Sequence, residues 1–142
     1  MRRFTFLLMI SCLLLATAGR LAAAEDAESY FQKGNSNLKQ GLWDQAIADF
    51  TQALKENPNY AMAYKNRGLA YMIKGLPDQA IADLNQAVKI NPNLEEAYDH
   101  RGLAYGQKGL YDQALDDFTQ SLKINPQYTL AYQHRALTYT VK

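Results

Sequence analysis

The sequence predicts an all-α protein built from tandem helix-turn-helix hairpins, and three observations support this prediction. The residues beyond the N-terminal segment repeat with a period of 34, a length typical of stacked repeat proteins. Apolar residues within each period recur at helical spacings and do not alternate as in a strand. Glycine or proline stands at the expected end of each helix. The period is visible at four sets of positions: Gly34, Gly68 and Gly102; Gly41, Gly75 and Gly109; Ala46, Ala80 and Ala114; and Pro58, Pro92 and Pro126.

The second unit shows how one period forms two helices. A first helix is expected over residues 61–74, and Gly75 can end it in a left-handed conformation. A second helix is expected to begin near Pro77, because proline suits a first helical turn, and to stop at Asn91-Pro92. The apolar faces hold Tyr64, Gly68 and Tyr71 in the first helix, and Ala80, Ile81, Leu84, Ala87 and Val88 in the second.

The same pattern divides the chain into units over residues 27–60, 61–94 and 95–128. Residues 129–142 form a partial fourth repeat or a capping helix. Small residues are expected where the two helices of a hairpin approach most closely, and a bulky replacement there would overpack the contact. They are Gly34, Gly68, Gly102 and Ala136, with Ala46, Ala80 and Ala114 expected opposite the three glycines.

Residues 1–24 have the layout of a secretory signal peptide. Two arginines precede an uncharged apolar run over residues 4–18, and small residues follow up to Ala24. We expect cleavage after Ala24, with Ala18 as second choice, and a periplasmic or secreted protein. An uncleaved membrane anchor is the alternative, although the run is shorter than the ~20 residues that span a bilayer and Arg20 interrupts the segment. Lipid attachment at Cys12 is disfavoured because the apolar run continues beyond it.

Cleavage would change both the charge and the chemistry of the chain. It removes three arginines and leaves 12 Lys and Arg against 14 Asp and Glu, a net charge of −2. This balance argues against a nucleic-acid partner, because phosphate binding needs clustered positive charge. Cleavage also removes Cys12, the only cysteine, and with it any disulfide or thiol chemistry.

The 34-residue pattern closely resembles the tetratricopeptide repeat family, over residues 27–142. The first unit departs at Asn37, where an aromatic residue is usual. The resemblance implies a right-handed superhelix of hairpins whose first helices line a concave groove. The matching residues are Tyr30, Gly34, Ala46, Phe50, Ala53 and Pro58 in the first unit; Tyr64, Gly68, Tyr71, Ala80, Leu84, Ala87 and Pro92 in the second; and Tyr98, Gly102, Tyr105, Ala114, Phe118, Ser121 and Pro126 in the third.

The sequence offers no catalytic constellation and no cofactor motif. Its glycines follow the repeat rather than a phosphate-binding loop. His100 and His134 lie one repeat apart, and with Asp99 they could hold a metal, but the ligand set is thin, so we interpret them as polar groove residues. Two columns of aspartates recur in every unit, which we interpret as helix capping and solvent-facing charge: Asp44, Asp78 and Asp112, and Asp49, Asp83 and Asp117.

A second apolar stripe on the first helices predicts a binding groove. Methionine and leucine side chains on this stripe suit adaptable binding of an extended or helical segment. Burial between neighbouring first helices is the alternative for Leu69, Leu103 and Leu137, which recur, whereas binding is favoured for Phe31 and the methionines. The predicted peptide-binding residues are Phe31, Asn35, Leu38, Met62, Lys65, Asn66, Leu69, Met72, Asp99, His100, Leu103 and His134.

Some tetratricopeptide proteins hold the C-terminal carboxylate of chaperones in a clamp of lysine, asparagine and arginine. Asn35 and Asn66 match two of its five positions, but Phe31, Glu96 and His100 stand where Lys, Lys and Arg are needed. An acid in place of a lysine repels a carboxylate, so the resemblance does not extend to this clamp.

We therefore expect an exported, non-enzymatic adaptor whose partner is a protein or peptide. We expect no cofactor, no nucleic acid and no small-molecule substrate, and contact with a membrane only if residues 1–24 are retained. The alternatives are a membrane-tethered scaffold for an envelope complex and a metal-binding protein that uses His100 and His134.

Overall fold

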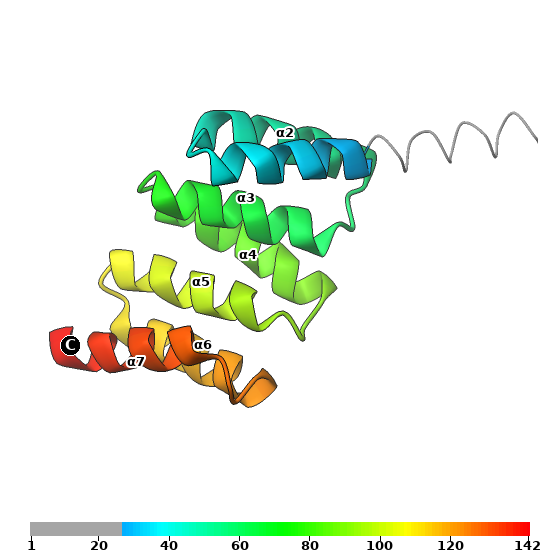
Figure 1. Ribbon diagram of the computed structural model, residues 1–142. Helices are drawn as coiled ribbons and strands as arrows, with labels where there is room; N and C mark the ends of the chain where they lie inside the picture. Colours follow the sequence, from blue (N-terminus) through cyan, green and yellow to red (C-terminus); the bar gives the residue numbers. More distant parts are fainter. Residues whose placement is uncertain (1–26) are drawn as a thin grey trace, which may run out of the picture.

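The computed structural model describes residues 27–142, which form a column of stacked helical hairpins (Figure 1). The expected signal peptide and Cys12 lie outside the described residues. Within residues 27–142 there are seven helices and no strand, so the predicted all-α fold of tandem hairpins is confirmed. None of these helices is both long and apolar enough to cross a membrane. The helices are residues 27–39, α2 (Trp43–Glu56), α3 (Ala61–Ile73), α4 (Pro77–Ile90), α5 (Glu95–Gln107), α6 (Tyr111–Ile124) and α7 (Thr129–Val141).

Glycine and proline set the helix boundaries as predicted. Gly75 has a φ of 72° just after α3, a left-handed conformation that favours glycine. The chain turns back there, and the Leu76 amide donates to the Tyr71 carbonyl at 2.9 Å, which satisfies a carbonyl at the helix end. Gly41 and Gly109 repeat this turn, each with a φ of 74°. Pro77 then lies in the first turn of α4.

The first helices of successive hairpins contact one another, whereas the second helices do not. Among the labelled helices, α3 contacts α5 and α5 contacts α7, but α2, α4 and α6 contact only first helices. Because the second helices are farther apart, the stack curves around the first helices. We call the surface formed by residues 27–39, α3, α5 and α7 the inner face.

The close approach of paired helices at the repeated glycines is confirmed, but the nearest neighbours are not the expected alanines. A Cβ on Gly68 would lie 2.8 Å from Cγ of Leu84, whereas the Ala80 carbonyl oxygen would be farther away, at 3.3 Å. At Gly34 and Gly102 the Cβ would lie 2.6 Å from Cε1 of Phe50 and Phe118, respectively. The glycines are therefore needed by the large core side chains. Ala136, by contrast, is exposed.

The expectation that Asp49, Asp83 and Asp117 face solvent is wrong. Their exposed fractions are 8%, 7% and 6%, because each carboxylate lies between the two helices of its hairpin and accepts hydrogen bonds there. Arg67 binds Asp83, and Arg101 binds Asp117. Asp44, Asp78 and Asp112 face solvent as expected, in the first turns of α2, α4 and α6, but none of these three helices has a side-chain cap hydrogen bond.

Candidate functional site

Three polar pairs join neighbouring first helices across the inner face. The amide Nδ2 of Asn66 on α3 donates to Oδ1 of Asn35 at 2.6 Å. The Lys65 ammonium on α3 donates to Glu96 on α5. On α5, the Asp99 carboxylate lies 2.9 Å from Nδ1 of His134 on α7. The helical repeat therefore brings together six polar residues, five of them from the predicted binding set, that are about one period apart in sequence.

The positive charge of Lys65 is already neutralised. Lys65 is only 6% exposed, and its single carboxylate partner is Glu96, whose side chain is 48% exposed. The hydrogen bond from Lys65 lowers the pKa of Glu96, so this carboxylate stays charged. Asp99 is 1% exposed, and burial raises its pKa although the hydrogen bond from His134 opposes the shift. The accessible charge near these pairs is therefore that of Glu96.

His100 is set apart from the Asp99–His134 pair. Its Nδ1 is buried and has no hydrogen-bond partner. Burial, and then the nearby Lys65, lower the pKa of His100 to about 4, so the imidazole is neutral at physiological pH. His134 directs its Nδ1 to the Asp99 carboxylate instead of sharing a site with His100. Within residues 27–142, no group of three or more His, Cys, Asp or Glu residues is arranged to hold a metal ion.

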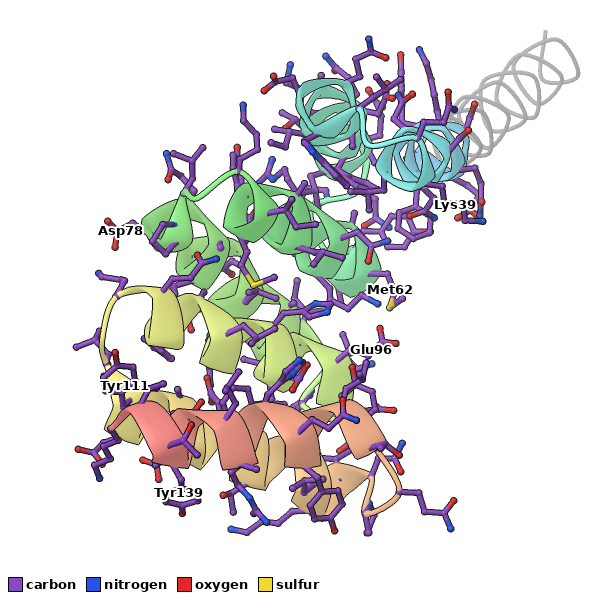
Figure 2. All side chains as sticks on the ribbon, turned by 60° about the vertical axis from the view of Figure 1, so that its left-hand side comes forward. Lys39, Met62, Asp78, Glu96, Tyr111 and Tyr139 are labelled. Atoms are coloured by element: carbon purple, nitrogen blue, oxygen red, sulfur yellow. The ribbon has the colours of Figure 1, made fainter. Side chains whose placement is uncertain are left out.

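Apolar side chains of the inner face differ widely in exposure. Leu38, Met62, Leu69 and Leu103 are half-buried against the core clusters. Figure 2 shows Met62 and Glu96 on the same side of the stack, on neighbouring helices. On α7, Leu130 is 49% exposed and Leu137 is 64% exposed.

Phe31 and Met72 lie in packed clusters and not on an open surface. Each is 8% exposed. Phe31 packs against Phe50, with ring centroids 5.8 Å apart, and Met72 shares a cluster with Leu84 and Ala104. Since so little of either side chain is accessible, we leave both out of the ligand-contacting set proposed below.

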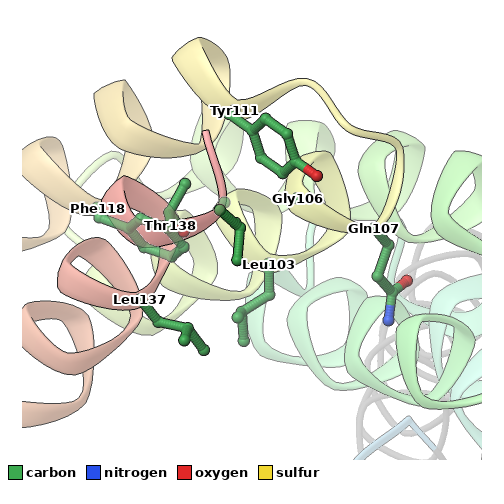
Figure 3. A pocket seen from close by; sticks show the side chains of 9 residues that line it. Leu103, Gly106, Gln107, Tyr111, Phe118, Leu137 and Thr138 are labelled. Carbon is green, nitrogen blue, oxygen red and sulfur yellow. The ribbon is translucent and has the colours of Figure 1, made fainter.

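A pocket of about 390 Å³ opens where α5, α6 and α7 meet (Figure 3). Its walls are mostly apolar, and Leu137 and Val141 on α7 are the exposed apolar side chains of its lining. The lining residues are Gly102, Leu103, Gly106, Gln107, Tyr111, Phe118, Leu137, Thr138 and Val141. Of these, only Leu103 belongs to the predicted binding set.

Comparison with family models gives two matches, both described as tetratricopeptide repeat, over residues 31–95 and 96–128. Together they span more than half of the chain. The chain belongs to the tetratricopeptide repeat family. A comparison with curated proteins gives no match.

Solved structures of tetratricopeptide domains share the fold. The Arabidopsis OM64 TPR domain is 29% identical with a TM-score of 0.82, covering 84% of this chain and 99% of that one. The first TPR of Spaghetti (RPAP3), bound to the HSP90 peptide SRMEEVD, is 27% identical with a TM-score of 0.80, covering 83% and 94%. MamA is 27% identical with a TM-score of 0.77, covering 81% and 67%.

In this tetratricopeptide protein, the five positions of the chaperone clamp are occupied in a different way. Asn35 and Asn66 are hydrogen-bonded to each other. Phe31 is buried in the core, Glu96 is a charged acid bound to Lys65, and His100 is neutral with a pKa of about 4. These five positions therefore offer no free cation to a carboxylate.

The sequence pattern missed the pocket of this tetratricopeptide protein, although a signal for it was present. Gly106 lies outside the two columns of glycines spaced by 34 residues, and Met72 stands one repeat before it. Val141 was also not predicted as a site residue. Its exposure depends on which side chains surround the end of α7, and the sequence pattern does not show this.

Proposed function

We propose that the chain is an exported, non-enzymatic adaptor that binds a protein or peptide segment in a groove along its inner face. The observation that carries the proposal is the combination of accessible apolar side chains and satisfied polar pairs on one face of a tetratricopeptide stack. Leu130 and Leu137 on α7 are 49% and 64% exposed, and Met62, Leu69 and Leu103 are half-buried beside the polar pairs. A protein segment of mixed apolar and polar character fits such a surface.

Related structures support a peptide ligand for the fold. The first TPR of Spaghetti (RPAP3), 27% identical to this chain, is solved with the HSP90 peptide SRMEEVD. The ligand of this chain is proposed to differ from an acidic chaperone tail. Glu96 supplies the accessible charge beside the polar pairs, and like charges repel. A neutral or basic segment is therefore the preferred partner.

Export is proposed from residues 1–24 alone, with cleavage after Ala24. The alternative is a membrane-tethered scaffold for an envelope complex, in which the same segment is retained. N-terminal sequencing of the protein purified from its native source distinguishes the two. A new N-terminus at Glu25 supports export with cleavage, and Met1 at the N-terminus contradicts it.

Peptide selection tests the groove. Random 12-residue peptides are selected on the full chain, and their affinity is measured by fluorescence anisotropy, with a Kd expected near the micromolar range, roughly −8 kcal/mol. The matched variants are Met62→Asp on the inner face and Gln86→Asp on α4, which is exposed and outside that face. Circular dichroism checks that both remain folded.

We expect Met62→Asp to weaken binding by about tenfold or more, because it places a charge beside the apolar ligand surface. Gln86→Asp should leave the affinity unchanged. The acidic peptide SRMEEVD should bind neither the parent chain nor the Met62→Asp variant. Equal affinities for the parent and Met62→Asp, or weakening by Gln86→Asp alone, would move the binding surface away from the inner face.

A further inference from the structure

Gly106 interrupts the internal repeat at the pocket between α5, α6 and α7. Met72 stands one period earlier, and Leu38 stands two periods earlier. Glycine loses more backbone freedom on folding than other residues, so its presence in the last turn of α5 calls for a reason. Neither backbone conformation nor crowding supplies one. The φ of Gly106 is not positive, and a Cβ added to it would meet nothing within 4 Å.

The preceding repeat shows which side chain fills the corresponding space. Met72 is 8% exposed and packs in a cluster with Leu84 and Ala104, and Leu69 and Leu103 pack against that cluster. Each of these four neighbours of Met72 (Leu84, Ala104, Leu69 and Leu103) has a counterpart 34 residues later that lines the pocket. The counterparts are Phe118, Thr138, Leu103 and Leu137. The same surroundings therefore enclose a methionine side chain in the second unit and open space in the third.

Apolar side chains at the pocket are exposed. Leu137 is 64% exposed, whereas Leu103, its counterpart one repeat earlier, is half-buried. Val141 at the rim of the pocket is 55% exposed. A volume of about 390 Å³ lies within the range of about 300–1,000 Å³ typical of ligand pockets. It has room for a long side chain together with part of the backbone that carries it.

We infer that this pocket is a subsite for one long apolar side chain, methionine or leucine, of the segment bound on the inner face. The side chain of the partner takes the place that Met72 occupies in the second unit, in contact with Phe118, Leu103 and Leu137. A flexible thioether adapts to such a space and packs favourably against an aromatic ring. The inference rests on the proposed function, since it assigns part of the specificity of the same groove.

Methyl NMR of the full chain tests the subsite with a defined probe. N-acetyl-methionine methylamide is titrated, and N-acetyl-lysine methylamide is the matched charged control. We expect saturable shifts of the Leu103, Leu137 and Val141 methyl groups, with a Kd on the order of millimolar for the methionine probe. The lysine probe should bind at least tenfold more weakly.

Gly106→Met, which restores the residue of the preceding repeat, should have two opposite effects. It fills the cavity and removes a helix glycine, so the Tm should rise by about 4 °C. It also occupies the subsite, so the shifts caused by the methionine probe should be lost. A gain in stability coupled to a loss of binding is not expected from a residue that only supports the fold.

Gly106→Ala provides a second variant, which is compatible with the helix and fills the pocket only in part. It should weaken binding of the methionine probe by a smaller factor than Gly106→Met does. Unchanged probe affinity in both variants, equal shifts with the lysine probe, or the absence of saturable shifts would overturn the inference. So would a dimer that Gly106→Met dissociates, or contacts of residues 4–18 with Leu137, because either would place a different occupant in the pocket.

The experiments can refute the proposed subsite without refuting the proposed groove. If peptides selected on the parent still lose affinity in Met62→Asp while the methionine probe causes no shift, the groove stands and the subsite is refuted.

Discussion

The Arg67 guanidinium holds the Asp83 carboxylate through two hydrogen bonds, from Nε to Oδ2 at 2.6 Å and from Nη2 to Oδ1 at 2.8 Å. Its third nitrogen, Nη1, donates to Oγ1 of Thr51 at 2.9 Å. Asp83 lies on α4 and Thr51 on α2, so one side chain of α3 joins the second helices of two successive units. Arg101 repeats the arrangement with Asp117 and Asn85.

Asp117→Ala should destabilise the protein by about 3 kcal/mol. Removing one partner of a largely buried ion pair leaves the other charge without compensation. The Arg101 side chain is 17% exposed, so little water can replace the lost carboxylate. Urea denaturation at neutral pH measures the change in the free energy of unfolding.

The double variant Arg101→Met/Asp117→Leu is the control for that measurement. It removes both charges and keeps apolar volume, so most of the loss should be recovered. If Asp117→Ala costs no more than the double variant, the pair contributes nothing specific to the stack.

The equivalent ion pair in the first unit, at Asp49, explains why that unit departs from the repeat at Asn37. Lys33 stands where Arg67 and Arg101 stand in the later units, and its ammonium lies 3.6 Å from Asp49 on a side chain that is 68% exposed. Asn37 supplies the missing donor, with Nδ2 2.6 Å from Asp49 Oδ2. The sequence analysis identified the departure at Asn37, but only the packed structure shows that Asn37 compensates for Lys33.

Gly102 and Gly106 lie one helical turn apart on α5, and alanine should have opposite effects at the two positions. A Cβ at Gly102 would lie 2.6 Å from Cε1 of Phe118, so Gly102→Ala should cost about 1–3 kcal/mol through overpacking. A Cβ at Gly106 meets nothing within 4 Å, so Gly106→Ala should stabilise by about 0.5–1 kcal/mol.

Urea denaturation of both alanine variants checks this contrast. The two glycines share a helix, so a general effect of helix propensity would shift both variants in the same direction. Stabilisation by Gly102→Ala would show that the contact with Phe118 relaxes at no cost.

Stability should fall as the pH falls from neutral, because of His100. Burial, and then Lys65, lower its pKa to about 4, whereas an unfolded histidine has a pKa of about 6.5. Between these values the unfolded chain binds a proton that the folded chain does not. The contribution of neutral His100 to stability is therefore present above about pH 6.5 and is lost towards pH 4. The free energy of unfolding should be roughly 2 kcal/mol lower at pH 5 than at pH 7.5.

His100→Gln should remove most of that loss, as measured by urea denaturation at the two pH values. The charges of Lys65, Glu96 and His134 act on the pKa of His100, and all three residues remain in the variant. The raised pKa of Asp99 acts in the opposite direction, since protonation relieves its burial as the pH falls. An equal loss in the parent and His100→Gln would assign the pH dependence to other groups.

The sequence alone predicted the helices and their boundaries well, because the period, Gly75 and Pro77 are local signals. It predicted the inner face less well, because burial depends on neighbouring helices. Phe31 and Met72 vary between units and were therefore expected to contact a ligand, yet both fill gaps in the core. Gly106, which no local rule singles out, is the residue that opens a pocket.

Site-specific photocrosslinking in the native source tests most directly whether the inner face binds a protein segment. A benzoylphenylalanine replaces Met62 on the inner face in one variant and the exposed Gln86 on α4 in the other. We expect a partner protein to be crosslinked from position 62 and not from position 86. Crosslinking of the same partner from position 86 alone, or equally from both positions, would contradict it.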